Sequence, residues 1–331
     1  MTLDRLVRNA ADAALEATVV LSFSRVGFAA RRRLNGWGEP TTELSRGRVA
    51  VVTGASGGLG LATAAGLARA GARVWLIGRD QHRTDAAARL VRRSVSDADV
   101  TVATADLTRL ADVRHLADTV HAGTDRLDVL VHNAGTLVSE YRQTVDGIER
   151  TAQTHLVAPF LLTSLLFGLL RSTPGSRVLS VSSAGMYTAR LDVDALSPDP
   201  AAFDGVTAYA QTKRAQVVLN EEWALRTRDT GVTFHAVHPG WADTPGLRSS
   251  LPRFHRVMGT LLRTCDQGAD TIIWLATDAQ ALASNGRFWH DRRPRSTVRL
   301  PWTATRPGAA DQLWHWCATR AGVPADPAGA R

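Results

Sequence analysis

The sequence predicts an α/β fold: a doubly wound parallel sheet in a single domain, preceded by a helical N-terminal arm and followed by a C-terminal extension. Three observations predict it. Short apolar runs of strand length alternate with longer helical segments from about residue 46. These runs are continuously apolar, as in strands buried on both faces of a parallel sheet. A glycine-rich turn joins the first run to the first helix, and 331 residues are enough for one large core.

The first 45 residues form the helical arm of this prediction. Residues 3–34 contain no proline, and no glycine before Gly27. Their apolar run, 13–21, is shorter than the roughly 20 residues that span a bilayer, and it lacks the basic start and cleavage site of a signal peptide. Because three arginines follow at 31–33, two alternatives stay open: a peripheral membrane contact, or an arm packed on its own domain or on a partner subunit.

The domain proper is predicted over 46–300, with strands and helices in alternation. Short runs rich in Val, Leu, Ile and Ala predict strands, at 48–52, 73–77, 100–103, 129–131, 178–181 and 232–237. The segments between them mix apolar and charged residues and predict helices, at 58–70, 82–95, 110–121, 145–171 and 209–228. A substrate loop is expected at about 241–263. The extension, 301–331, is rich in Pro, Ala and Gly, and a last helix is expected at 312–319.

Composition excludes several classes of function. The net charge is +8, but the arginines are scattered and no DNA- or RNA-binding motif is found, so nucleic acid is not an expected partner. The two cysteines, Cys265 and Cys317, exclude a disulfide framework and favour a reducing, cytoplasmic location. No Cys/His spacing is typical of zinc sites, so no metal is expected. Of the 39 Lys and Arg residues, only Lys213 is a lysine.

The turn between the first strand and the first helix, TGASGGLG at 53–60, has the pattern of a phosphate-binding turn. Its glycines allow a tight bend and let the backbone approach a phosphate closely. The N-terminus of the next helix then presents free N–H groups to that phosphate. This context indicates a Rossmann-type dinucleotide site. The residues expected to bind the cofactor here are Thr53, Gly54, Ser56, Gly58, Leu59 and Gly60.

The end of the second strand bears on the choice of nucleotide. An NAD site usually has a carboxylate there, which binds the ribose hydroxyls. This chain has Gly78 followed by Arg79, and a guanidinium can pair with the 2′-phosphate of NADP. We therefore expect NADP(H), while Asp80 keeps NAD(H) open because a small shift in register would bring its carboxylate to the ribose.

Tyr209 and Lys213 stand four residues apart in a predicted helix, so their side chains lie on one face. A phenol has an ordinary pKa of about 10. A neighbouring ammonium stabilises the phenolate, so the tyrosine can exchange a proton near neutral pH. Oxidation of an alcohol, or reduction of a carbonyl, needs such a proton at oxygen while hydride moves at carbon. The pair therefore predicts an oxidoreductase with Tyr209 as its acid/base.

These motifs resemble the classical short-chain dehydrogenase/reductase family from about Gly47 to Gly286, and most closely its member-twelve dehydrogenase/reductase branch. The resemblance to the branch lies in the stretches 24–28, 203–205, 209–219, 238–246 and 288–292. It implies that Ser183 is the catalytic serine, with Ser182 as the alternative if the register slips. The cofactor residues it implies, beside Tyr209 and Lys213, are Asp106, Leu107, Asn133, Ala134, Gly135, Pro239, Gly240 and Thr244.

The resemblance implies hydride transfer between NAD(P)(H) and a carbonyl or alcohol, with action as a carbonyl reductase favoured by NADPH. The long spacing between Ser183 and Tyr209 accompanies lipophilic substrates in similar branches. The substrate pocket is expected from the 187–206 insertion and the 241–263 loop, with the apolar side chains Met186, Tyr187, Trp241, Leu247, Leu251 and Met258.

One position departs from the family. Thr154 stands where the family has an asparagine that helps to hold a water, which relays protons to the lysine. A threonine hydroxyl has fewer donor and acceptor sites, and its neighbour His155 is expected to face another way. The alternative function is therefore a catalytically weak protein that binds a nucleotide or senses redox state. Pairing through the Tyr209 helix would give a homo-oligomer, and the N-terminal arm could instead block it.

Overall fold

The computed structural model describes residues 3–38 and 45–326. Within these ranges the strands form one eight-stranded sheet, in the order β3-β2-β1-β4-β5-β6-β7-β8. The strands from β3 through β7 run parallel, and β8 at the edge is antiparallel to β7. This confirms the predicted doubly wound parallel sheet. The strands are β1 (Val49–Thr53), β2 (Arg73–Gly78), β3 (Val100–Thr104), β4 (Val129–His132), β5 (Arg177–Val181), β6 (Thr233–Val237), β7 (Arg287–His290) and β8 (Arg293–Arg295).

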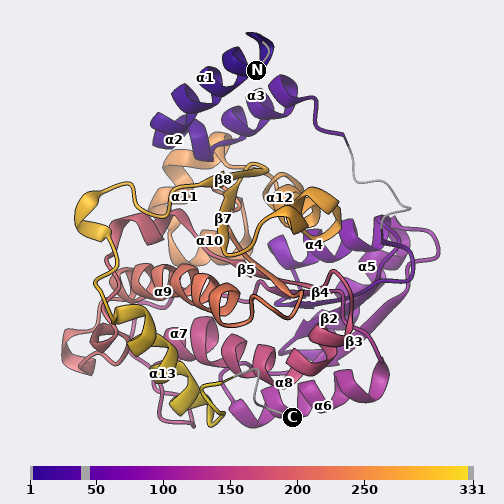
Figure 1. Cartoon of the computed structure of the whole chain (residues 1–331), viewed down its shortest axis with the longest axis vertical. Coiled ribbons are helices and arrows are strands. Elements are labelled where there is room, and N and C mark those ends of the chain that lie inside the picture. The colour runs from indigo at the N-terminus through magenta and orange to yellow at the C-terminus, as the bar shows by residue number, and fades with distance from the viewer. Residues whose placement is uncertain (1–2, 39–44, 327–331) are drawn as a thin grey trace.

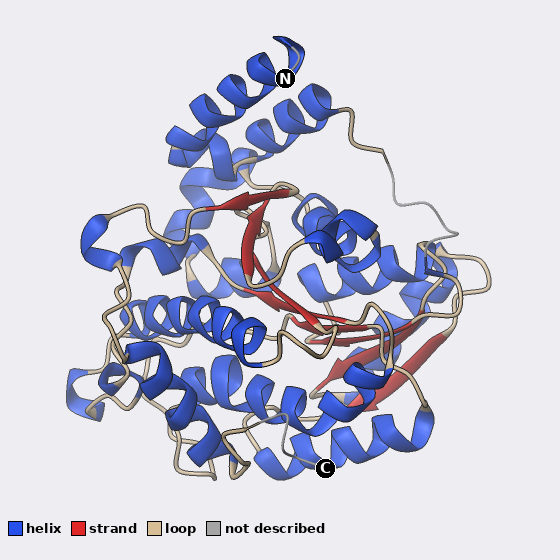
Figure 2. Ribbon diagram, viewed as in Figure 1, coloured by secondary structure: helices blue, strands red, loops and turns tan. Residues whose placement is uncertain are grey.

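Helices cover both faces of the sheet (Figures 1 and 2). On one face α4, α5 and α12 bury alanine, valine, leucine and isoleucine side chains against the strands, and on the other face α6, α8 and α9 bury theirs. Every residue of β1 is buried, which is why the strands lack the alternating pattern of a half-exposed sheet. These helices are α4 (Gly58–Arg69), α5 (Gln81–Ser94), α6 (Leu110–Gly123), α8 (Ala158–Ser172), α9 (Gly205–Arg226) and α12 (Cys265–Thr277).

The strand order determines where a ligand can bind. Strands β2 and β4 both pair with β1, on its two sides, so the direction of winding reverses there. In open parallel sheets, ligands bind outside the carboxyl ends of the strands, next to such a reversal. The loops after β1, β2, β4, β5 and β6 all leave from this edge, so segments distant in sequence meet at one place.

The long apolar helix begins later than the sequence predicted. Its first residue is Arg150 rather than residue 145, because Glu149 is the N-cap. The Glu149 carboxylate accepts hydrogen bonds from the backbone N–H groups of Thr151 and Ala152, both at 2.8 Å. A cap of this kind satisfies N–H groups that have no partner inside the helix. Apolar spacing alone did not locate it.

The turn that follows α7 (Arg150–Ala152) is π-helical, over η2 (Gln153–Val157), before the helix resumes as α8. A π-helical turn is wider than an α-helical one and changes the direction in which its side chains point. In the described part of the chain, the run Arg150–Ser172 is the one helix long and apolar enough to cross a membrane. However, 78% of its apolar window is buried inside the protein, as in a core helix.

The last part of the chain completes the core. Helix α13 (Ala309–Ala321) contains the predicted final helix and packs on α8 and α9 (Figure 1). Trp314 is fully buried, and its ring meets those of Phe160 and Trp223 edge-on, each with ring centres 4.8 Å apart. This packing explains the aromatic residue in a tail that otherwise looks polar and proline-rich.

The N-terminal arm folds into three helices at the end of the molecule beyond β8 (Figure 1). Arg31 is fully buried, and its guanidinium pairs with Asp12 and with Asp291, each at 2.7 Å. Because Asp291 follows β7, this contact packs the arm on its own domain. The three helices are α1 (Leu3–Ala17), α2 (Val19–Phe23) and α3 (Arg25–Asn35).

Candidate active site

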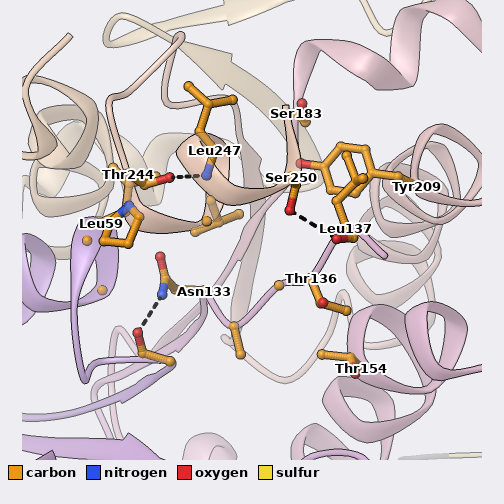
Figure 3. A pocket seen from close by; sticks show the side chains of 18 of the residues that line it. Leu59, Asn133, Thr136, Leu137, Thr154, Ser183, Tyr209, Thr244, Leu247 and Ser250 are labelled. Atoms are coloured by element: carbon orange, nitrogen blue, oxygen red, sulfur yellow. Dashed lines mark hydrogen bonds between the residues drawn. The ribbon is translucent and has the colours of Figure 1, made fainter. Parts of the chain in front are cut away.

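A cavity of about 1050 Å³ opens at the carboxyl edge of the sheet. Its walls come from the loops after β1, β2, β3, β4, β5 and β6 and from helix α9; part of this lining is shown in Figure 3. A volume of this size is at the upper end of the range for ligand sites. Every residue that the sequence assigned to catalysis or cofactor binding lies on its lining: Thr53, Gly54, Ser56, Gly58, Leu59, Gly60, Arg79, Asp106, Leu107, Asn133, Ala134, Gly135, Ser183, Tyr209, Lys213, Pro239, Gly240 and Thr244.

The glycine-rich turn is packed tightly against the loop that follows β4. At Gly54, where φ is +67°, a Cβ would lie 2.8 Å from the Cα of Ala134, and at Gly60 it would lie 2.3 Å from the Gly54 carbonyl oxygen. The side-chain amide of Asn133 joins the two segments by donating to the Thr53 carbonyl at 2.9 Å. The first N–H groups of α4 have no partner within the helix and this end lines the cavity, so the turn fits a pyrophosphate.

The end of β2 has no room for a side chain at Gly78. A Cβ there would lie 2.2 Å from the Thr84 hydroxyl oxygen, so the carboxylate of a typical NAD site does not fit this position. Arg79 is exposed on the lining, and Arg83, which the sequence analysis did not single out, lies at the same end of the cavity. The Asp80 carboxylate caps α5 by accepting from the Arg83 backbone N–H at 2.8 Å.

Ser183 and Tyr209 lie at the other end of the cavity, across from Leu59 (Figure 3). Lys213 also lines the cavity. Ser183 follows β5, and its hydroxyl lies close enough to the Tyr209 phenol to lower the pKa of that phenol. Lys213 lies one turn along α9, with Nζ 5.5 Å from the centre of the Tyr209 ring. The alternative serine, Ser182, is engaged elsewhere: its hydroxyl donates to the Lys213 backbone carbonyl at 2.9 Å and joins β5 to α9.

Burial dominates the proton affinities of this pair. It raises the pKa of the Tyr209 phenol above its ordinary value, and the nearby Ser183 hydroxyl offsets only part of this rise. Burial lowers the pKa of Lys213 to about 7. The protein by itself therefore lacks the lowered phenol pKa that the sequence predicted, because removal from water outweighs the effect of the lysine. Lys213 is the member of the pair that titrates near neutral pH.

His155 lies beside this site. Unlike its neighbour Thr154, it is not on the cavity lining, so the two side chains face different ways as expected, but the His155 ring lies close to Tyr209 and Lys213. It belongs to the π-helical turn η2, and its ring centre lies 5.6 Å from that of Tyr209. Its Nε2 accepts from the Thr136 backbone N–H at 2.9 Å, so the proton of the neutral ring is on Nδ1 and donates to the Thr212 hydroxyl at 2.8 Å. Burial and the charge of Lys213 lower the pKa of His155. The neutral ring therefore holds the loop after β4 against α9.

Apolar side chains line the part of the cavity next to Tyr209, and Figure 3 shows Leu137 and Leu247 among them. The hydroxyl of Ser250 donates to the Leu137 carbonyl at 3.0 Å, which joins the 241–263 loop to the loop after β4. The 241–263 loop contains α10 (Pro245–Ser250) and α11 (Pro252–Met258). The apolar lining residues are Leu137, Val206, Trp241, Leu247, Leu251 and Phe254.

Three predicted lining residues are not on the cavity lining: Met186, Tyr187 and Met258. Met186 and Tyr187 are buried in a separate apolar cluster, together with Phe23 of the arm and Phe288 of β7. The Tyr187 hydroxyl donates to the Ser296 carbonyl at 3.0 Å, which turns the ring away from the cavity. These side chains attach the arm to the sheet instead of contacting a ligand.

The sequence of the chain matches known proteins over most of its length. A model of the short chain dehydrogenase family matches residues 48–253. The human and bovine proteins named dehydrogenase/reductase SDR family member 12 are 37% and 38% identical to it over 269 residues, which are 81% of this chain and 84% of each relative. Mouse retinol dehydrogenase 14 is 32% identical, over 91% of this chain and 93% of the relative.

Solved structures share the fold. An uncharacterized protein from Mycobacterium paratuberculosis has a TM-score of 0.68 and 28% sequence identity, over 86% of this chain and 97% of that chain. The Pseudomonas aeruginosa RhlG/NADP active-site complex has a TM-score of 0.63 and 25% identity, over 76% of this chain and 96% of that chain. The second of these binds NADP on a fold of the same kind.

Proposed function

This chain belongs to the short-chain dehydrogenase/reductase family of NAD(P)-dependent oxidoreductases, and on that premise we propose that it transfers hydride between NADP(H) and a lipophilic carbonyl or alcohol. The observation that carries the proposal is that Ser183, Tyr209 and Lys213 line the same cavity as the dinucleotide-binding turn. The resemblance to the member-twelve branch is confirmed by the human and bovine relatives.

The proposed mechanism uses the hydroxyls of Ser183 and Tyr209. Both residues line the cavity, so a substrate oxygen placed against both hydroxyls would take the phenol proton as it gains negative charge. The ammonium of Lys213 would then stabilise the phenolate and return a proton to it. The turn at 53–60 and the Asn133 segment would hold the cofactor, which when bound supplies or accepts the hydride at carbon.

The preference for NADP(H) is supported by the end of β2. A side chain does not fit at Gly78, and the Asp80 carboxylate already caps α5, so neither position offers a carboxylate to ribose hydroxyls. Arg79 and Arg83 bring two guanidinium groups to this end of the cavity. A 2′-phosphate is the group that such a pair would recognise.

A lipophilic substrate is supported by the apolar lining next to Tyr209. Leu137, Leu247 and Leu251 come from two loops that meet over the cavity, and an apolar molecule gains by leaving water for such a surface. One relative with 32% identity is named a retinol dehydrogenase, and retinol is a lipophilic alcohol. The proposed substrate class is therefore an apolar aldehyde, ketone or alcohol.

The test is Tyr209→Phe, which removes the phenol oxygen and keeps the ring. We expect turnover to fall by at least about 100-fold, because the substrate oxygen loses its proton donor, while the dissociation constant for NADPH changes little. Turnover is followed as NADPH oxidation with a panel of aliphatic, aromatic and long-chain aldehydes and ketones. Tyr141→Phe is the matched control, since Tyr141 packs against Phe203 away from the cavity.

Two outcomes would count against the enzyme. Retained turnover in Tyr209→Phe would remove the assigned acid/base. Tight NADPH binding by the wild-type protein, without oxidation by any member of the panel, would favour the alternative of a catalytically weak nucleotide-binding or redox-sensing protein.

A further inference from the structure

The departure from the family at Thr154 leaves the lysine without the expected partner. Thr154 lines the cavity, but its hydroxyl donates to the Arg150 carbonyl at 2.8 Å, within its own helix. A hydroxyl has one donor, and here it is used locally. The groups that do reach the lysine come from elsewhere.

Lys213 has two oxygen acceptors inside the protein. Its Nζ donates to the Val181 backbone carbonyl at 2.9 Å and to Oε1 of Gln216 at 3.0 Å. Lys213 and Gln216 are almost completely buried, with 3% and 4% of their surfaces exposed. Hydrogen bonds from a buried ammonium to such oxygens favour its charged form, whereas burial alone opposes it.

A third group fixes the orientation of the Gln216 amide. Its Nε2 donates to the His155 backbone carbonyl at 3.1 Å. Because a carbonyl oxygen can only accept, the amide nitrogen must face His155 and the amide oxygen must face Lys213. His155 lies next to Thr154 in the π-helical turn η2. This turn therefore acts on the lysine through Gln216.

We propose that Gln216 is a positioning residue for the reaction: it holds Lys213 Nζ at the cavity and stabilises the ammonium, in place of the asparagine that the family has at the position of Thr154. The inference deepens the proposed function and rests on it, since it concerns the lysine of the same site. Gln216 acts through Lys213 and is not on the cavity lining.

The two acceptors leave one position on Nζ for proton exchange. An ammonium has three N–H bonds and a neutral amine has two. Val181 and Gln216 accept two N–H groups in either form, so the proton that is gained or lost occupies the third position, toward the cavity that Lys213 lines. The lysine can therefore exchange a proton with the cavity while both contacts stay in place.

Few titratable groups lie close enough to Lys213 to obscure its own titration. In the described part of the chain, two titratable side chains face Lys213: Tyr209 on the same helix and His155 on η2. The lowered pKa of His155 keeps that ring neutral at neutral pH, and the raised pKa of Tyr209 keeps the phenol protonated. The other neighbours do not titrate at neutral pH. They are the Val181 carbonyl and the Gln216 amide, which accept from Nζ, the Ser182 hydroxyl, which donates to the Lys213 backbone carbonyl, and Gly135.

The test measures the proton affinity of Lys213 directly. Lys213 is the one lysine of the sequence, so lysine-specific carbon-13 labelling of the full chain, with a lysine-free purification tag, gives a single side-chain Cε signal. The shift of that signal with pH is recorded for wild type and Gln216→Met, without cofactor or substrate. The control is Gln211→Met, the same exchange on the same helix, where the amide oxygen accepts from the Asp192 N–H instead.

We expect Gln216→Met to lower the pKa of Lys213 by about one unit or more, and Gln211→Met to leave it within about 0.3 unit of wild type. If Gln216→Met does not fold, Gln216→Glu replaces it, and its carboxylate is expected to raise the pKa by about one unit or more. An unchanged pKa in Gln216→Met, or the absence of a rise in Gln216→Glu, overturns the proposal. This test measures no turnover. Its result is therefore independent of whether the proposed reaction takes place, and a failure of one proposal can be told from a failure of the other.

Discussion

At the scale of single residues, each of the three consecutive residues at the end of β2 has a different role. Gly78 has no room for a side chain, Asp80 caps the next helix, and Arg79 between them is left exposed on the cavity lining. The carboxylate that would have suited NAD is therefore used for folding. The charge that this end presents to a nucleotide is positive, and it comes from Arg79 and Arg83.

Arg79→Ala should weaken the binding of NADPH and leave the binding of NADH almost unchanged. A hydrogen bond to a charged group contributes about 1.5–3 kcal/mol, so the dissociation constant for NADPH should rise about tenfold or more. That for NADH should change little, because NADH has no 2′-phosphate. The measurement is quenching of protein fluorescence by each cofactor, with Arg69→Ala, an exposed arginine of α4, as the control. An equal rise in the dissociation constants of NADPH and NADH would show that Arg79 does not recognise the 2′-phosphate.

The site residues differ in how far the sequence could predict them. Tyr209 and Lys213 could be predicted because an i, i+4 pair shares a helix face. Gln216 follows Lys213 by three residues and shares that face too, but the sequence does not show that this face is buried. His155 could not be placed, because its direction depends on a π-helical turn, and helical spacing assumes a regular helix.

At the scale of elements, a buried ion cluster joins the N-terminal arm to the substrate loop. The guanidinium of Arg263 pairs with Asp291 at 2.6 Å and donates to the Phe23 carbonyl at 3.1 Å. It also lies so close to Gly240 that a Cβ there would be 2.3 Å from its Nε. The backbone N–H of Trp241 donates to the same Phe23 carbonyl at 2.8 Å. The arm thereby fixes the start of the loop that lines the cavity.

Arg31→Met should break this cluster from the arm side. Burial raises the pKa of Asp291, but the charges of Arg263 and Arg31 hold it well below its ordinary value. Removal of one partner leaves Asp291 poorly compensated, which is expected to lower the free energy of unfolding by roughly 3–5 kcal/mol. Urea unfolding measures this loss.

The exposed Arg33 on the same helix gives the control variant Arg33→Met, for which little change is expected. Unfolding of Arg31→Met and Arg33→Met at the same urea concentration would show that the ion cluster does not stabilise the arm. Arg31→Met should also raise the KM for substrate more than it lowers kcat, because the loop at Trp241 loses its support while Tyr209 and Lys213 keep theirs.

The elements of the sheet could be predicted where their strands are continuously apolar, as in β1 and β2. The arm's packing and β7–β8 could not. The stretch from Arg287 to Arg295 contains four arginines in nine residues, a composition typical of a surface. It is buried in part because Arg31, 260 positions away from Asp291, supplies a partner. Pairing over that separation has no local signal in the sequence.

At the scale of the whole molecule, the core contains histidines that the folded state keeps neutral. Burial lowers the pKa of His132 to about 3 and that of His235 to about 4. The pKa values of His238 and His290 are also lowered, chiefly by burial. In the unfolded chain each imidazole would titrate at about 6.5. Folding therefore excludes protons that the unfolded chain binds at mildly acidic pH.

The sign of the effect follows from these values. Above pH of about 6.5 both states of the chain hold these histidines neutral, and their contribution to stability is complete. As the pH falls below that value, these histidines bind protons in the unfolded chain but stay neutral in the folded protein, until the pH reaches the folded pKa values of about 3 for His132 and about 4 for His235. The free energy of unfolding should therefore fall by about 1.4 kcal/mol per pH unit for each such histidine. Asp12, whose pKa is raised by burial but lowered overall to about 2 by Arg295 and Arg31, adds a loss in the same direction below its ordinary 3.8.

Urea unfolding at intervals between pH 8 and pH 4.5 tests this acid lability. His132→Gln removes one titrating group and keeps a partner for the Thr163 hydroxyl, which His132 Nε2 contacts at 2.7 Å. It should flatten the fall in unfolding free energy by about 1.4 kcal/mol per pH unit below pH 6. His115→Gln, at an exposed histidine of α6, should leave the slope as in wild type. A wild-type stability that stays level on acidification, or equal slopes in the two variants, would contradict the neutral burial of these histidines.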